Sequence, residues 1–310
     1  MPDPLLFLKS MGAAAIVSAM FVLAMAWRRP ASSVWLNSVC VLAMGLGLAL
    51  GCDMLAVRWT WPPVKALDRF LMIVVPMALG IELLAELQGM PRWVARFLRA
   101  SLAATTPRIL LHGSVYLSGA GNHWTRWEAG TALVLCGVLL AGAWGLLLWL
   151  SQRSGGISIP LALGLTTHCA GVTVMLAGYL RGGGTAFPLA ATIVATVIAA
   201  KLITMRSDTP AKFDSPAIIG VGVIGLFGVL MIGQFFGRLS TGCALTLLLI
   251  PLLCWTTEVP FLRHRKPWLV GSVRLVLVAI PLLVVLAVAK RDFYRNMAPL
   301  LGDLPRHATK

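Results

Sequence analysis

Long apolar runs, separated by short polar connections, dominate this sequence. An α-helix rises 1.5 Å per residue, so about 20 apolar residues cross the hydrocarbon core of a bilayer. Nine runs reach or approach that length, at residues 11–27, 34–57, 70–87, 129–150, 157–180, 186–202, 217–236, 241–255 and 268–289. One soluble core cannot bury so many apolar helices, whereas lipid can surround them.

The composition agrees with a membrane location. Of the 310 residues, 58% are hydrophobic and 12% are charged, against about 25% charged residues in a soluble globular domain. We therefore predict an all-α, polytopic bundle of about nine transmembrane helices, with eight to ten as the range. Residues 1–292 form a single membrane domain, and residues 293–310 form a short basic tail.

The net charge of +15 does not indicate nucleic-acid binding, because the basic residues stand in small clusters at the ends of the apolar runs. Such clusters contact anionic lipid headgroups and set topology. The expected partners are the lipid bilayer, its anionic headgroups and other membrane proteins or a second copy of the chain. We expect a bacterial-type inner membrane, with the N-terminus outside and the C-terminus in the cytoplasm. A tenth helix would remove that preference.

Residues 91–128 do not fit the pattern of ordinary spans. Between 91 and 104, Trp93, Phe97 and Leu102 share one helical face, and Arg92 and Arg99 lie on the other side. This pattern is typical of an amphipathic helix lying in the membrane interface. Residues 107–121 are short and polar for a span. They form a loop, a re-entrant segment or a tenth helix.

Charged residues inside spans are the main candidates for a functional site, because each costs about 2.5–3.5 kcal/mol to insert at a helix centre. Glu82 and Glu86 lie four residues apart and share a face of the third run. We predict that they bind a proton or a cation, with Arg274 of the ninth run as their counter-charge. His168, near the middle of the fifth run, is the predicted proton relay or substrate contact. The alternative for each residue is a purely structural role.

A second candidate site lies in the polar segment after residue 107. His112, His123 and Glu128 resemble the components of a hydrolase or transferase at the membrane surface. Their spacing matches no nucleophile motif, and the sequence contains neither G-x-S-x-G nor H-E-x-x-H nor a Walker A loop. We therefore predict no metal and no cofactor, and we favour a protein that is not an enzyme.

Three functions follow from these observations. The first is a transporter-like or permease-like protein with a small intramembrane polar site, which we favour. The second is a membrane-embedded enzyme that acts on a lipid or lipid-linked substrate. The third is a scaffold or accessory subunit, which would present the glycine-rich run 217–236 as a packing face.

Overall fold

The computed structural model describes residues 4–27, 33–57, 60–87, 90–118, 124–154, 156–206, 216–258 and 267–296. Every regular element in those ranges is a helix, which confirms the predicted all-α class. The long helices are α1 (Pro4–Trp27), α2 (Ser33–Met54), α5 (Arg92–Leu111), α7 (Arg126–Arg153), α8 (Ser158–Leu176), α9 (Leu180–Arg206), α10 (Pro216–Phe236) and α13 (Pro267–Asn296). The shorter elements are α3 (Ala66–Arg69), the π-helix η1 (Phe70–Val74), α4 (Val75–Ala85), α6 (Val115–Ser118), α11 (Thr241–Leu249) and the 3-10 helix η2 (Ile250–Glu258).

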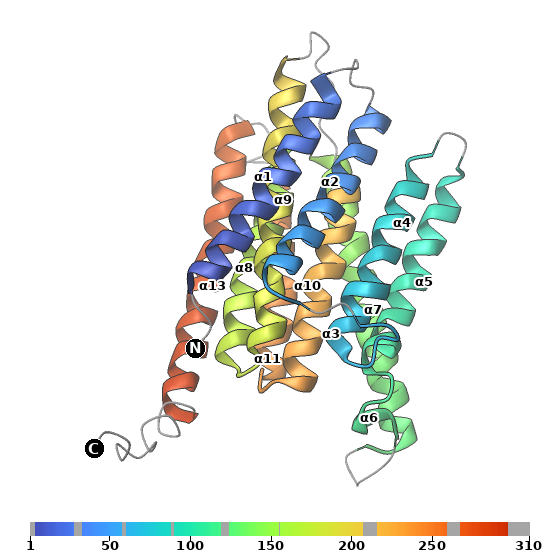
Figure 1. The fold of residues 1–310 in the computed structure, drawn as a ribbon, viewed down its shortest axis with the longest axis vertical. Coiled ribbons are helices and arrows are strands. Elements are labelled where there is room, and N and C mark those ends of the chain that lie inside the picture. The colour runs from blue at the N-terminus through green and yellow to red at the C-terminus, as the bar shows by residue number, and fades with distance from the viewer. Residues whose placement is uncertain are drawn as a thin grey trace.

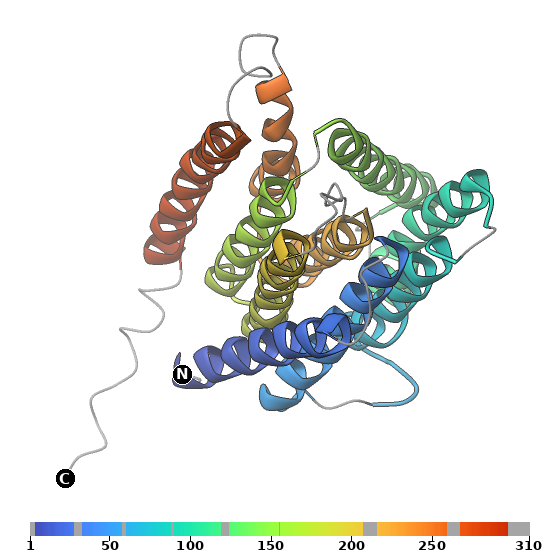
Figure 2. The ribbon, with the colours of Figure 1, turned by 90° about the horizontal axis from the view of Figure 1, so that it is seen from above.

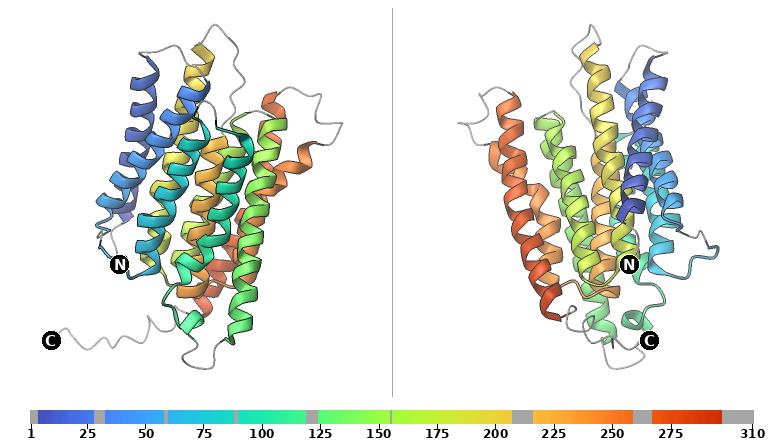
Figure 3. Two further views of the ribbon diagram at one scale, coloured as in Figure 1. Left: turned by 90° about the vertical axis from the view of Figure 1, so that its right-hand side faces the viewer. Right: turned by 60° about the vertical axis from the view of Figure 1, so that its left-hand side comes forward.

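The long helices run alternately up and down in one bundle (Figure 1, Figure 3). Eight of the described helices are long and apolar enough to cross a membrane. Two further rods stand beside them, namely α5 and the continuous segment formed by α3, η1 and α4. The chain is therefore a bundle of apolar helices of the kind that spans a membrane.

Helix α5 corrects the sequence-based description of residues 91–128. The segment forms one continuous helix to Leu111, which packs upright against α4 and α7. The helix continues through residues 107–111, where the sequence also allowed a loop or a re-entrant segment to begin. Its position at the membrane interface stays a prediction. With this additional helix, α1 begins and α13 ends at the same end of the bundle (Figure 1). The expectation of termini on opposite sides loses its basis, and the basic clusters no longer favour either end for the cytoplasm.

Helix α10 occupies the centre, between α2, α4, α7, α8 and α9 (Figure 2). Its five glycines allow side chains of neighbouring helices to approach the backbone. A Cβ atom would lie 2.2 Å from Glu82 at Gly220, 2.4 Å from Leu163 at Gly222, 2.3 Å from Leu189 at Gly225, 2.1 Å from Phe70 at Gly228 and 2.5 Å from Val174 at Gly233. The glycines therefore serve close internal packing, and α10 is not the exposed face that the scaffold hypothesis required.

Two helices change their winding beside a proline. The π-helix η1 directly precedes Pro76 in the first turn of α4, and α11 becomes the 3-10 helix η2 at Pro251. Proline has no N–H to donate and its ring clashes with the carbonyl four residues earlier, so it disturbs the regular hydrogen bonding of a helix at these two places. In both places the altered winding keeps the rod continuous.

The turn between α8 and α9 differs from the sequence-based boundary. Helix α8 ends beside Gly178, whose φ of 88° favours glycine. The glycines at 182, 183 and 184, which separate the fifth and sixth apolar runs in the sequence, lie inside α9. A Cβ atom at Gly183 would lie 2.5 Å from the Gly171 carbonyl oxygen of α8. These glycines therefore bring α8 and α9 into close contact.

Candidate functional site

The most deeply buried charge among the predicted site residues is Glu82, one turn before the end of α4. Its side chain has no exposed surface. Both carboxylate oxygens accept hydrogen bonds from Arg99 of α5, with Nε 2.8 Å from Oε1 and Nη2 2.6 Å from Oε2. The Arg99 side chain is 16% exposed. This two-pronged ion pair joins α4 to α5, and the fork geometry of arginine matches a carboxylate.

The carboxylate of Glu82 lies in a niche that other helices complete. Gly220 of α10 leaves room for it, since a Cβ atom there would lie 2.2 Å from Oε1 and 3.1 Å from the Trp144 ring of α7. Trp144 is 2% exposed and its indole N–H has no hydrogen-bond partner. The niche therefore contains the ion pair, and the ring of Trp144 lies beside it.

Glu86 lies one turn beyond Glu82, at the end of α4. Its Oε1 accepts a hydrogen bond of 3.1 Å from the Asn37 amide of α2. Glu82 and Glu86 therefore lie on one side of α4, as their spacing predicts, and each has its own partner. The two residues form a polar cluster with Asn37 and Arg99 near the end of α4 and the start of α5.

The predicted pairing of Arg274 with these glutamates is wrong. Arg274 of α13 is buried and donates to the Thr257 hydroxyl at 2.6 Å, to the Ser158 hydroxyl at 3.2 Å and to Glu258 Oε1 at 2.9 Å. These contacts tie α13 to η2 and to the start of α8. The glutamate in this ion pair belongs to the eighth run, whose last turn continues to residue 258.

His168 also lies apart from the glutamates. It is half-buried on α8, and its ring centroid is 5.0 Å from that of Phe187 on α9. Phe187 in turn contacts Phe7 of α1. The structure therefore places His168 in an aromatic contact between α8, α9 and α1. Its role as a proton relay stays a prediction.

The second predicted site is not assembled in the described residues. His112 is exposed at the end of α5, where its backbone carbonyl accepts a hydrogen bond from Arg69. Glu128 accepts hydrogen bonds from the backbone N–H and the hydroxyl of Thr125, and so forms a capping box at the start of α7. His123 lies outside the described residues. Glu128 therefore has a structural role that explains its presence.

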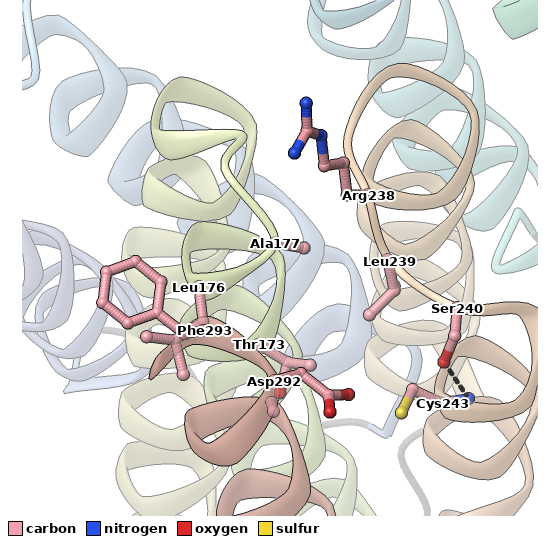
Figure 4. A pocket seen from close by; sticks show the side chains of 10 residues that line it. Thr173, Leu176, Ala177, Arg238, Leu239, Ser240, Cys243, Asp292 and Phe293 are labelled. Atoms are coloured by element: carbon pink, nitrogen blue, oxygen red, sulfur yellow. Dashed lines mark hydrogen bonds between the residues drawn. The ribbon is translucent and has the colours of Figure 1, made fainter. Parts of the chain in front are cut away.

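A pocket of about 230 Å³ lies at the lower end of the bundle, away from Glu82. The end of α8, the α10–α11 turn and the last turns of α13 form it (Figure 4). Asp292 points toward Ser240 and Cys243, whereas the Arg238 guanidinium points away from them (Figure 4). Sequence reasoning did not find this pocket, because its residues come from three separate segments and no motif connects them.

Arg99 is the site residue that sequence reasoning missed. We assigned it to the solvent side of an interfacial helix together with Arg92. One signal was available: a buried carboxylate requires a partner, and Arg99 is the third arginine of a row that begins at the α5 N-terminus. Within the described ranges, no three His, Cys, Asp or Glu residues come close enough to hold a metal ion.

No protein-family model and no curated protein matches this sequence. The class of protein therefore follows from the fold. The helices of the bundle are long and apolar enough for a multi-pass integral membrane protein. The Glu82–Arg99 pair, enclosed by α4, α5, α7 and α10, is its candidate functional site.

Proposed function

We propose that this protein is a transporter or permease whose intramembrane polar site is the Glu82–Arg99 pair. The observation that carries the proposal is the complete burial of Glu82 in a niche between four helices. Ionisable residues inside membrane spans are costly, and those that face a bundle interior mark substrate or ion pathways. Transporters of several folds place their sites where separate helices converge.

A purely structural role explains this pair less well. Removing two charges from solvent costs several kcal/mol per ion, and well-packed apolar side chains stabilise a core equally well or better. Helix α4 is also irregular, since a π-turn and Pro76 precede Glu82. Such π-turns occur frequently at functional sites. The buried charge and the irregular helix together favour a site that opens to water during function. They fit a permanent structural contact less well.

Native cysteines provide a test of this opening. Asn37 and Cys40 lie three residues apart on α2 and therefore share a face, and Asn37 contacts the polar cluster through Glu86. Cys40 is 1% exposed. We would keep Cys40 alone, replace the other five cysteines by serine, and label right-side-out and inside-out vesicles with a charged, membrane-impermeant methanethiosulfonate.

Transport predicts that Cys40 reacts from at least one side, because the site must open to water during the cycle. The substitution Glu82→Gln weakens the ion pair and raises the reaction rate. The matched control retains only Cys52, which lies on the same helix with no exposed surface, and it remains unreactive. The proposal fails if Cys40 is as unreactive as Cys52 in both vesicle orientations, with and without Glu82→Gln.

A further inference from the structure

A row of arginines on α5 leads to the buried pair. Arg92, Arg96 and Arg99 are spaced by four and three residues, so their side chains follow one face of the helix. Arg92 and Arg96 are exposed, whereas Arg99 extends into the niche of Glu82. The positive charge thus continues from the N-terminus of α5 to the candidate site. Such a row attracts anions and raises their local concentration.

We propose that the niche binds an oxyanion together with one proton, an inference that rests on the transport function proposed above. The proton adds to the Glu82 carboxylate and makes it neutral. The Arg99 guanidinium, released from Glu82, then donates its two parallel hydrogen bonds to two oxygens of the anion. Carboxylate, phosphate and sulfonate groups all present oxygens in this arrangement. The ring of Trp144, whose indole N–H has no hydrogen-bond partner, lies beside the same niche.

Charge balance explains why the proton and the anion must bind together. Protonation of Glu82 alone leaves the Arg99 charge without a partner in a largely dry niche, and an anion alone adds a second negative charge beside one cation. Each state is costly in a region of low dielectric. Only simultaneous binding keeps the net charge of the niche unchanged, so the structure couples one proton to one negative charge.

The other groups that face the niche leave this balance intact. Glu86, on α4 itself, is a further charge that acts on Glu82. It accepts a hydrogen bond from the Asn37 amide of α2, the helix that also carries the buried thiol of Cys40. Helix α10 carries no ionisable side chain, and the charged residues of α2 and α7 lie close to their ends. Besides Arg99, α5 carries Arg92 and Arg96 on the approach and Arg108 at its other end. Arg108 is exposed and is therefore a matched control.

Binding is tested with benzenesulfonate, which remains an anion throughout the neutral pH range. Purified full-length protein in a non-ionic detergent is titrated calorimetrically between about pH 8 and pH 6. We expect Kd to fall by up to about tenfold per pH unit, as one-proton linkage requires. Glu82→Gln retains binding and removes its pH dependence. The double variant Arg92→Gln/Arg96→Gln binds more weakly at low salt, whereas Arg108→Gln binds like the wild type.

Vesicles then identify the source of the anion, because a soluble solute and a lipid headgroup present the same chemistry. In phosphatidylcholine vesicles with trapped pyranine, external benzenesulfonate acidifies the lumen if the wild type carries a soluble anion with a proton, and Glu82→Gln does not acidify it. Binding without acidification, with competition by phosphatidylglycerol, assigns the oxyanion to a lipid headgroup. Both results support the oxyanion site.

Other results would overturn the inference. Benzenesulfonate binding that is absent, independent of pH, or equally weakened by Arg108→Gln contradicts the proton-coupled oxyanion site. If Cys40 nevertheless becomes accessible in vesicles, the transport proposal stands and the site takes a different solute. If Cys40 remains unreactive while benzenesulfonate binds with the expected pH dependence, the oxyanion site is supported and the transport proposal is contradicted.

Discussion

The two halves of the Glu82–Arg99 pair differ in exposure, and this predicts unequal effects of removing each. We consider Arg99→Met and Glu82→Met, which replace either charge by a flexible apolar side chain of similar length. Arg99→Met leaves a carboxylate with no exposed surface and without either donor. Glu82→Met leaves a guanidinium that is 16% exposed and can extend toward water.

The expected magnitudes follow from this difference. Removing one partner of a buried pair costs about 3–5 kcal/mol. A carboxylate can avoid this cost by taking up a proton, which at pH 7 requires about 3.7 kcal/mol for a glutamate with an ordinary pKa of about 4.3. We therefore expect Arg99→Met to lower the free energy of unfolding by about 4 kcal/mol. Glu82→Met loses charged hydrogen bonds worth on the order of 2 kcal/mol.

The pH dependence gives a second, independent result. In Arg99→Met the folded protein holds a proton on Glu82 that the unfolded chain releases at neutral pH. Raising the pH above the ordinary glutamate range therefore favours unfolding, and the free energy of unfolding falls by up to about 1.4 kcal/mol per pH unit. The destabilisation shrinks as the pH falls. Glu82→Met shows no such slope, because arginine keeps its charge over this range.

Unfolding by SDS in mixed micelles, followed by circular dichroism, measures these differences. The double variant Glu82→Met/Arg99→Met completes the cycle and is expected within about 1 kcal/mol of the wild type, since apolar replacement of a buried pair is often neutral. The reasoning is refuted if Arg99→Met is no less stable than Glu82→Met, or if the double variant loses the sum of both single effects.

Three further predictions concern packing outside this pair. Gly228→Ala forces a methyl group against the Phe70 ring and lowers the free energy of unfolding by about 1–3 kcal/mol. Gly145→Ala places its methyl group in open space and is neutral or stabilising. The same SDS titration compares the two variants, and equal effects contradict the packing argument. Arg274→Lys cannot keep three hydrogen bonds in place and lowers the thermal midpoint in detergent; an unchanged midpoint would show that the contacts contribute little. Thr125→Ala removes the α7 cap and costs about 1 kcal/mol, seen as faster hydrogen exchange confined to the first turn of α7.

The helical class and most of the spans followed from the sequence, because the length of an apolar run alone determines whether it can cross a bilayer. Helix α5 did not follow. Its arginines make it amphipathic, and amphipathicity alone does not distinguish a helix in the headgroup layer from one packed upright beside other helices. In the structure, Arg99 is accommodated by Glu82 on the neighbouring α4, a contact that no periodicity reveals.

The candidate site was predicted in part. Glu82 and Glu86 were identified because charges inside apolar runs are rare, and their spacing placed them on one face. Their partners could not be assigned, because pairing depends on which helices are neighbours in space. Arg274 was the only arginine well inside an apolar run, yet Glu258 lies closer to it than the distant glutamates of α4. Local sequence therefore located the charges, and the packing of the bundle selected the pairs.

The central position of α10 has a consequence for biosynthesis. The helices that surround it, α2, α4, α7, α8 and α9, all precede it in the chain. At roughly 5–20 residues per second, ribosomes finish α5 on the order of ten seconds before α10 emerges. During that interval the niche of Glu82 lacks the wall that Gly220 provides. Helices α4 and α5 are adjacent in the sequence, so they can enter the membrane as a hairpin with the two charges already neutralising each other.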